Sequence, residues 1–278
     1  MVVPVSLVAL VGAVGAGFAG ALLGLGGGIF IVPFATLVLG YDVHHAIGAS
    51  IVSVIATSCG AAATYVAGDV ANVRIGSFLE LATTTGALAG AVLASRASSR
   101  VLTLLFAGLL LYSAYTMFRA RRAELPEGVR PHPLAERLKL NGCYYDRSLG
   151  RDVSYNVANV PHGFGVMWVA GLTSGLLGIG SGLLKVLGMD LFMKLPLKVS
   201  TATSNLMIGV TAAASAGYYF AHGLIDPALA GPVAIGVFGG ARLGAWAMAR
   251  LRSRTLRLIF VPVLVYVAVQ MLMRGMGG

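Results

Sequence analysis

Two glycine-rich runs carry the clearest chemical signal in this chain. Each run follows an apolar segment and precedes a second apolar segment that is too short to cross a membrane. The positions are Gly24, Gly26, Gly27, Gly28, Gly178, Gly180, Ser181 and Gly182. Glycines that open a helix expose backbone N–H groups where the helix dipole favours negative charge. Two such helix ends predict a binding site for a small oxyanion, although glycines can also serve only to let helices pack closely.

Polar side chains extend this candidate site. Ser50 and Ser204 occupy equivalent positions 154 residues apart, and Asn205 follows the second of them. Their hydroxyl and amide groups could donate hydrogen bonds to a bound oxyanion. The alternative is that they bond to carbonyls of their own helix or of a neighbouring helix.

Charged residues inside apolar segments are costly and therefore informative. Lys185 stands three residues after Gly182 and is the best candidate for recognising a negative charge, unless its long side chain reaches the membrane surface instead. Its counterpart in the first copy is Ile31, so the site would be asymmetric. Glu80 and Arg242 are expected to form a buried ion pair with each other or to take part in proton coupling.

These candidate residues are carried by two copies of one sequence pattern. An ungapped offset of 154 residues relates positions 17–117 to positions 171–271. The apolar segments, five in each copy, are expected at residues 2–23, 29–40, 45–67, 75–95 and 101–118, then at 162–177, 183–193, 199–221, 228–249 and 255–273. The second segment of each copy is shorter than the roughly 20 residues that a crossing needs. It therefore forms either a crossing of its own or a re-entrant hairpin with the first segment, broken at the glycines.

The composition predicts an all-α polytopic membrane protein. Hydrophobic residues make up 57% of the chain and charged residues 11%, and the mean hydropathy is +0.85. In such a protein the net charge of +10 is a topology signal rather than a sign of nucleic acid binding. Two dispersed cysteines and the absence of His/Glu metal spacing or a Ser/His arrangement predict no metal, no cofactor and no enzymatic activity.

The distribution of Lys and Arg predicts that the two copies are inverted. With the central linker in the cytoplasm, inversion places 15 Lys and Arg residues inside and 3 outside, whereas a parallel arrangement gives 10 and 8. We therefore expect a first membrane repeat at residues 1–118, a cytoplasmic linker at 119–160 and a second repeat at 161–278. Both termini are expected outside the plasma membrane.

The linker has a pattern of its own. Residues 138–146 and 151–157 alternate loosely between apolar and polar positions, which suggests a small β-hairpin. A lid or a docking element for a partner is one interpretation. A solvated connector with a little local structure is the favoured one, given the length of the segment.

The glycine runs and the polar helices resemble one known family. The stretches GALLGLGGGIFIVPF (20–34), GASIVSVIATS (48–58), SGLLGIGSGLLKV (174–186) and LKVSTATSNLMIGVTAAASAG (197–217) are similar to the TauE/SafE sulfite exporter family, also called the toluenesulfonate uptake permeases. The resemblance implies transport of sulfite, sulfonates or related sulfur-containing anions, with the family's glycine motifs at 24–28 and 178–182. The chain departs from the repeated pattern at Ser181, which replaces a glycine, and at Leu187, which stands where the first copy has Pro33.

Together these features predict a secondary transporter of small sulfur-containing anions that works by alternating access. An inside-negative potential favours export of an anion by about 2.3 kcal/mol per 100 mV. The expected partners are the anion and the lipid bilayer, with a homo-oligomer as an open option. The alternative function is a non-transporting membrane partner that recruits a soluble protein through residues 119–160.

Overall fold

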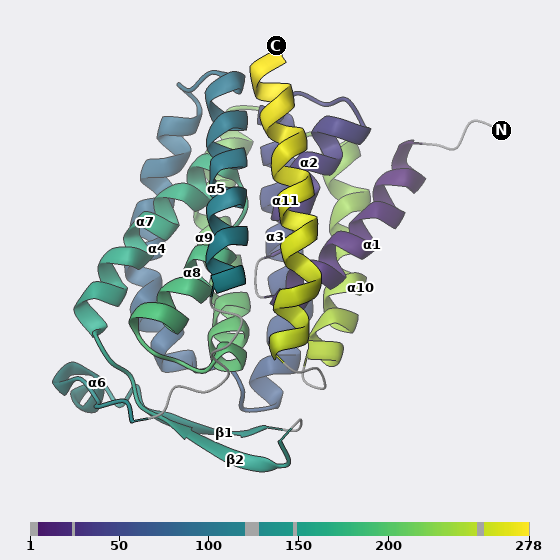
Figure 1. Cartoon of the computed structure of the whole chain (residues 1–278). Helices are drawn as coiled ribbons and strands as arrows, with labels where there is room; N and C mark the ends of the chain where they lie inside the picture. The colour runs from purple at the N-terminus through teal and green to yellow at the C-terminus, as the bar shows by residue number, and fades with distance from the viewer. Residues whose placement is uncertain (1–4, 24–25, 120–127, 147–148, 249–252, 278) are drawn as a thin grey trace.

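The computed structural model describes residues 5–23, 26–119, 128–146, 149–248 and 253–277 as a helical bundle with one small sheet (Figure 1). The first copy contains α1 (Val5–Leu23), α2 (Gly28–Pro33), the π-helix η1 (Phe34–Val38), α3 (Val43–Ala67), α4 (Val73–Ala94) and α5 (Ser99–Arg119). The second contains α7 (Val160–Leu177), α8 (Gly182–Leu187), the π-helix η3 (Gly188–Phe192), α9 (Leu197–Ala221), α10 (Pro227–Met248) and α11 (Ser253–Gly277). The linker holds α6 (Pro133–Arg137), β1 (Gly142–Asp146) and β2 (Arg151–Tyr155). The expected all-α membrane fold is confirmed.

The short second segment of each copy is a half-length helix. Each combines six α-helical and five π-helical residues, which at about 1.5 Å per residue span only about half of a hydrocarbon core. The one in the first copy ends beside the C-terminal helix, because Arg274 donates a hydrogen bond to the carbonyl of Thr36. The one in the second copy ends beside the linker, where the amide of Ala158 donates to the carbonyl of Met193 at 3.0 Å. The two half-length helices therefore end at opposite ends of the bundle.

Two equivalent interfaces join the copies. In the first, Gly240 of α10 faces the backbone carbonyl of Val14 on α1; in the second, Gly86 of α4 faces the carbonyl of Trp168 on α7. The two pairs are related by the offset of 154 residues with the helices exchanged. A glycine leaves room for the partner's backbone, and small residues are what bring helices close in membranes. Each copy therefore packs its first helix against the fourth helix of the other copy.

The close packing at these glycines predicts that a larger side chain there destabilises the folded protein. A Cβ atom at Gly175 of α7 would collide with the carbonyl oxygen of Ala87 on α4, whereas one at Gly165 of the same helix would meet nothing within 4 Å. We expect Gly175→Val to lower the free energy of unfolding by about 1–3 kcal/mol, the usual cost of overpacking. Gly165→Val is the matched control, and thermal unfolding in detergent is the measurement. Equal losses in the two variants would contradict this account of the interface.

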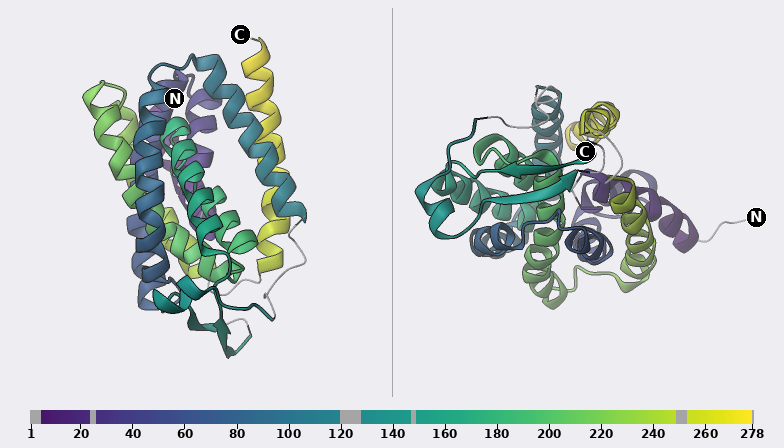
Figure 2. Two further views of the ribbon diagram at one scale, coloured as in Figure 1. Left: turned by 90° about the vertical axis from the view of Figure 1, so that its left-hand side faces the viewer. Right: turned by 90° about the horizontal axis from the view of Figure 1, so that it is seen from below.

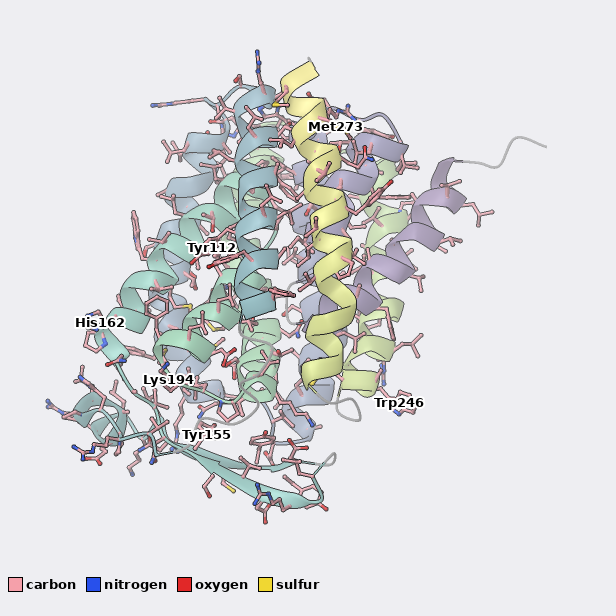
Figure 3. All side chains as sticks on the ribbon, viewed as in Figure 1. Tyr112, Tyr155, His162, Lys194, Trp246 and Met273 are labelled. Carbon is pink, nitrogen blue, oxygen red and sulfur yellow. The ribbon has the colours of Figure 1, made fainter. Side chains whose placement is uncertain are left out.

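The outer surface of the bundle suits a bilayer. Four helices are long and apolar enough to cross a membrane by length and composition: Val43–Ala67, Val73–Ala94, Val160–Leu177 and Pro227–Met248. Large apolar side chains face outward, among them Leu81, Ile235 and Phe220, which are 66%, 69% and 73% exposed. Tyr112, Trp246 and Met273 project from the same surface (Figure 3). Lipid is therefore the natural solvent of this surface.

The linker forms the expected β-hairpin. Its strands pair antiparallel, with Gly142 opposite Tyr155 and Asp146 opposite Arg151. The hairpin lies across one end of the helical bundle (Figure 2). Tyr144 and Val153 pack against Val199 of α9, and burial, with the nearby charge of Asp146, raises the pKa of the Tyr144 hydroxyl.

Polar contacts fix this hairpin to α4 and α9. The side-chain amide of Asn72, the N-cap of α4, donates to the carbonyl of Leu140 and to the hydroxyl of Tyr155, both at 2.9 Å. Lys198 in the first turn of α9 lies 2.7 Å from Asp146 Oδ1, and both residues are buried. The hairpin is therefore packed onto the bundle rather than surrounded by solvent, because some of its apolar and charged side chains find partners on the helix ends.

Candidate anion-binding site

The two glycine loops meet inside the bundle. A Cβ atom at Gly28 would lie 2.9 Å from the carbonyl oxygen of Gly178, and one at Gly26 would lie 3.6 Å from that of Ile179. Val54 of α3 and Ile208 of α9 flank both loops. Gly24 lies outside the described residues. The expected meeting of two broken helices is thus observed for the described parts of both loops, which are buried in this conformation.

The loops share one backbone feature and differ in another. Gly26 and Gly180 are equivalent, and both adopt left-handed backbone conformations, with φ of +75° and +69°. At the next position Gly27 is right-handed, whereas Ser181 is left-handed with φ of +47°. The hydroxyl of Ser181 donates to its neighbour's carbonyl, that of Gly180, at 2.8 Å. The departure of the second run from glycine therefore places a side chain where a left-handed backbone is costly.

We expect Ser181→Gly to stabilise the protein by about 0.5–1 kcal/mol, because glycine adopts the left-handed conformation without strain. The measurement is the unfolding midpoint in detergent. The matched control is Gly27→Ser in the other loop, where a side chain would instead approach Thr57 and Val237 closely. A lower midpoint for Ser181→Gly would contradict this, because it would mean that the hydrogen bond of the Ser181 hydroxyl stabilises the protein by more than the left-handed backbone destabilises it.

The candidate hydroxyls hold the loops in place. Ser50 donates to the carbonyl of Gly178 at 2.6 Å, and Ser204 donates to that of Gly182 at 3.1 Å. In the first loop the amide of Gly27 donates to the hydroxyl of Thr57 at 3.0 Å. Ser50 and Ser204 are therefore beside the glycine runs as expected. In this conformation both hydroxyls donate their hydrogen bonds to backbone carbonyls of the loops and not to a ligand.

Asn205 lies at the same meeting point. Its amide nitrogen donates to the carbonyls of Ala21 and Thr201 at 3.2 and 3.1 Å. Its Oδ1 atom is buried and has no hydrogen-bond partner among the described residues. A buried acceptor without a donor is rare in proteins and indicates a position where a water molecule or ligand can bind.

Lys185 lies one turn beyond the second loop and is completely buried. Its ammonium group donates to the hydroxyl of Thr211 and lies 3.8 Å from Glu80 Oε2. The hydroxyl of Thr211 lies 2.5 Å from the other oxygen of Glu80. Thr211 thus bridges a cation on α8 and a carboxylate on α4, and the side chain of Lys185 does not reach the membrane surface.

The structure corrects the expected partner of Glu80. Arg242 is exposed on α10, a helix that packs on α1 and α3, so the Glu80–Arg242 pair is wrong. Glu80 lies six residues after Arg74 and Arg242 eight residues before Arg250, so the sequence implies a similar depth in the membrane for both. It does not show on which side of the bundle each residue lies. The observed partner is Lys185.

The polar cluster exists in one copy only. Ile31, Thr57 and Ala234 occupy the positions equivalent to Lys185, Thr211 and Glu80. The hydroxyl of Thr57 accepts a hydrogen bond from the amide of Gly27 in the first loop, whereas the hydroxyl of Thr211 donates to the carboxylate of Glu80. The sequence signal that could have pointed to Thr211 is its position seven residues after Ser204, which places both hydroxyls on one face of α9.

Comparison with known proteins decides the family. A family model described as "Sulfite exporter TauE/SafE" matches residues 8–271. This chain belongs to the TauE/SafE family. Two Bacillus subtilis (strain 168) proteins are similar to it: "Probable membrane transporter protein YunE", 28% identical over 268 residues and 94% of both chains, and "Probable membrane transporter protein YdhB", 28% identical over 224 residues, or 80% of this chain and 82% of that protein. No solved structure matches. This TauE/SafE chain is therefore a multi-pass membrane transporter.

Proposed function

We propose that this transporter is a secondary carrier of small sulfur-containing anions such as sulfite, sulfonates or related organosulfur anions. The observation that supports this most strongly is the meeting of two glycine loops, each opening a half-length helix, with Lys185 one turn beyond the second. Helix N-termini and a buried cation both favour a negatively charged guest. The proposal that the anion contains sulfur rests on membership of the TauE/SafE family.

Alternating access is the proposed mechanism, and the arrangement of the copies supports it. The two half-length helices end at opposite ends of the bundle, and the first helix of each copy packs on the fourth helix of the other copy. Both features are typical of inverted repeats that rock around a shared binding site. In Figure 1, α5 runs toward the hairpin whereas its counterpart α11 runs away from it. We further propose that the linker is cytoplasmic, that both termini lie outside the plasma membrane, and that net export follows an outward gradient of the anion.

A panel of small sulfur compounds tests the substrate class. Sulfite, thiosulfate, sulfoacetate and taurine are added to the purified protein, with chloride as the control, and the unfolding midpoint is measured. A true ligand stabilises the folded state as its concentration rises above its dissociation constant, by about 2.7 kcal/mol at a hundredfold excess. Stabilisation by chloride alone would contradict the assignment to sulfur anions.

The hairpin gives the alternative function some support, since the exposed Tyr145 could contact a soluble protein. Recruitment of a partner as the sole function predicts that deleting residues 125–155 abolishes activity while Lys185→Ala does not. A carrier with its site at Lys185 predicts loss of transport in Lys185→Ala. Measuring both variants side by side separates the two functions.

A further inference from the structure

We propose that Glu80 carries the proton that couples this transporter, so that one proton travels with each anion in the same direction. The inference rests on the proposed function, because it names the coupling ion of the same site. It starts from the pair in which Lys185 Nζ lies 3.8 Å from Glu80 Oε2, with the hydroxyl of Thr211 between them.

An anion and Glu80 compete for one cation. The side chain of Lys185 has no exposed surface, and its ammonium group is held by Thr211 and Glu80. An anion that binds Lys185 would therefore lie beside the carboxylate of Glu80. An ionised Glu80 would then lie beside a second negative charge in a poorly solvated site, which favours its neutral form. Protonation of Glu80 removes the repulsion and frees Lys185 for the anion.

A groove on the outer surface of the bundle reaches Glu80 but not Lys185. A groove of about 520 Å³ lies between α4 and α9, lined on α4 by residues from Val73 to Thr85 and on α9 by Leu206, Met207 and Val210. It begins at the first residue of α4, beside the hairpin, and reaches Glu80 seven residues later, or about 10 Å along the helix. The side chain of Glu80 is 12% exposed and that of Lys185 is 0% exposed. Glu80 is therefore open to the outside of the bundle and Lys185 is not, so a proton that reaches Glu80 need not pass Lys185.

The charge balance of the cycle is simple. In the empty carrier the carboxylate of Glu80 and the ammonium of Lys185 neutralise each other. On loading, the carboxylate takes one proton from water and becomes a carboxylic acid, while Lys185 keeps its charge and holds the anion. On release the carboxylic acid returns the proton to water and the pair re-forms. A monovalent anion would thus move without net charge.

The other titratable groups on α4 and on the two helices that pack most extensively against it, α7 and α9, have partners of their own or are exposed. Arg74 donates to the carbonyl of Lys139, Lys198 pairs with Asp146, Tyr218 bonds to Ser95, Tyr219 bonds to the carbonyl of Gly175, and His162 is exposed in the first turn of α7 near the hairpin (Figure 3). Since Ala234 replaces Glu80 in the other copy, the cycle carries one proton.

The test uses the purified full-length protein in vesicles that contain a pH-sensitive dye. Thiosulfate and sulfoacetate serve as probes, because their charge is constant at pH values near neutrality. We expect influx of a probe to acidify the lumen. The apparent dissociation constant of the probe should rise about tenfold for each pH unit above the range in which Glu80 is protonated. Glu80→Gln, which mimics the neutral form, should retain exchange of labelled for unlabelled probe and lose proton movement. Glu136→Gln, an exposed carboxylate in α6, should behave as the unaltered protein.

The outcomes separate coupling from transport. Probe influx without acidification in the unaltered protein would overturn the coupling and leave the proposed function intact. Transport of neither probe by folded protein would overturn both. Proton movement that persists in Glu80→Gln would assign the proton to another group and so overturn the role of Glu80. The dye measurement on the unaltered protein remains decisive if Glu80→Gln does not fold.

Discussion

Replacing Lys185 with methionine is expected to abolish anion transport and to lower the free energy of unfolding by about 3–5 kcal/mol. Methionine keeps much of the length of the side chain but removes its charge, so the carboxylate of Glu80, only 12% exposed, would be left without its cation. An uncompensated buried charge is far more costly than the pair itself. The two measurements are thermal unfolding in detergent and probe uptake by vesicles.

Two further variants separate stability from function. The double variant Lys185→Met with Glu80→Gln removes both charges and should recover most of the lost stability without recovering transport. Lys194→Met removes an exposed lysine at the hairpin end of the bundle (Figure 3) and should change neither property. Full transport by Lys185→Met would remove this residue from the anion site.

The second large effect is expected at the linker. Lys198 and Asp146 are 6% and 4% exposed, so breaking their pair with Lys198→Met or Asp146→Asn should weaken the docking of the hairpin by about 3–5 kcal/mol. The hairpin would then open more often, which limited proteolysis and hydrogen exchange of β1 and β2 both report.

The control for this prediction is Asp152→Asn, which alters an exposed carboxylate on β2. Its proteolysis rate should match that of the unaltered protein. Equal rates for Asp146→Asn and Asp152→Asn would mean that the apolar contacts of Tyr144 and Val153 with Val199 hold the hairpin by themselves.

The helices of this protein could be predicted closely from its sequence, because lipid-facing helices must be apolar and of a fixed minimum length. The expected segment at 45–67 is observed as Val43–Ala67, and that at 199–221 as Leu197–Ala221. The glycine runs and the repeat could also be found in the sequence, because comparing the sequence with itself at an offset of 154 residues does not depend on how the helices pack. The hairpin followed from its alternating pattern.

Side-chain partners across helices could not be predicted in the same way. Glu80 pairs with Lys185 rather than with Arg242 because the crossing of α4, α8 and α9 brings those residues together, and hydropathy carries no information about which helices are neighbours. The docking of the linker was missed for the same reason, since Lys198 and Asp146 are 52 residues apart. Depth in the membrane can be estimated from sequence, but position around the bundle cannot.

The most direct test of the account is uptake of radiolabelled sulfite and sulfoacetate by vesicles that contain only this purified protein. The account predicts uptake that saturates with concentration, that unlabelled sulfur anions compete away, and that Lys185→Met abolishes. Vesicles containing folded protein that admit neither anion faster than protein-free vesicles would contradict it.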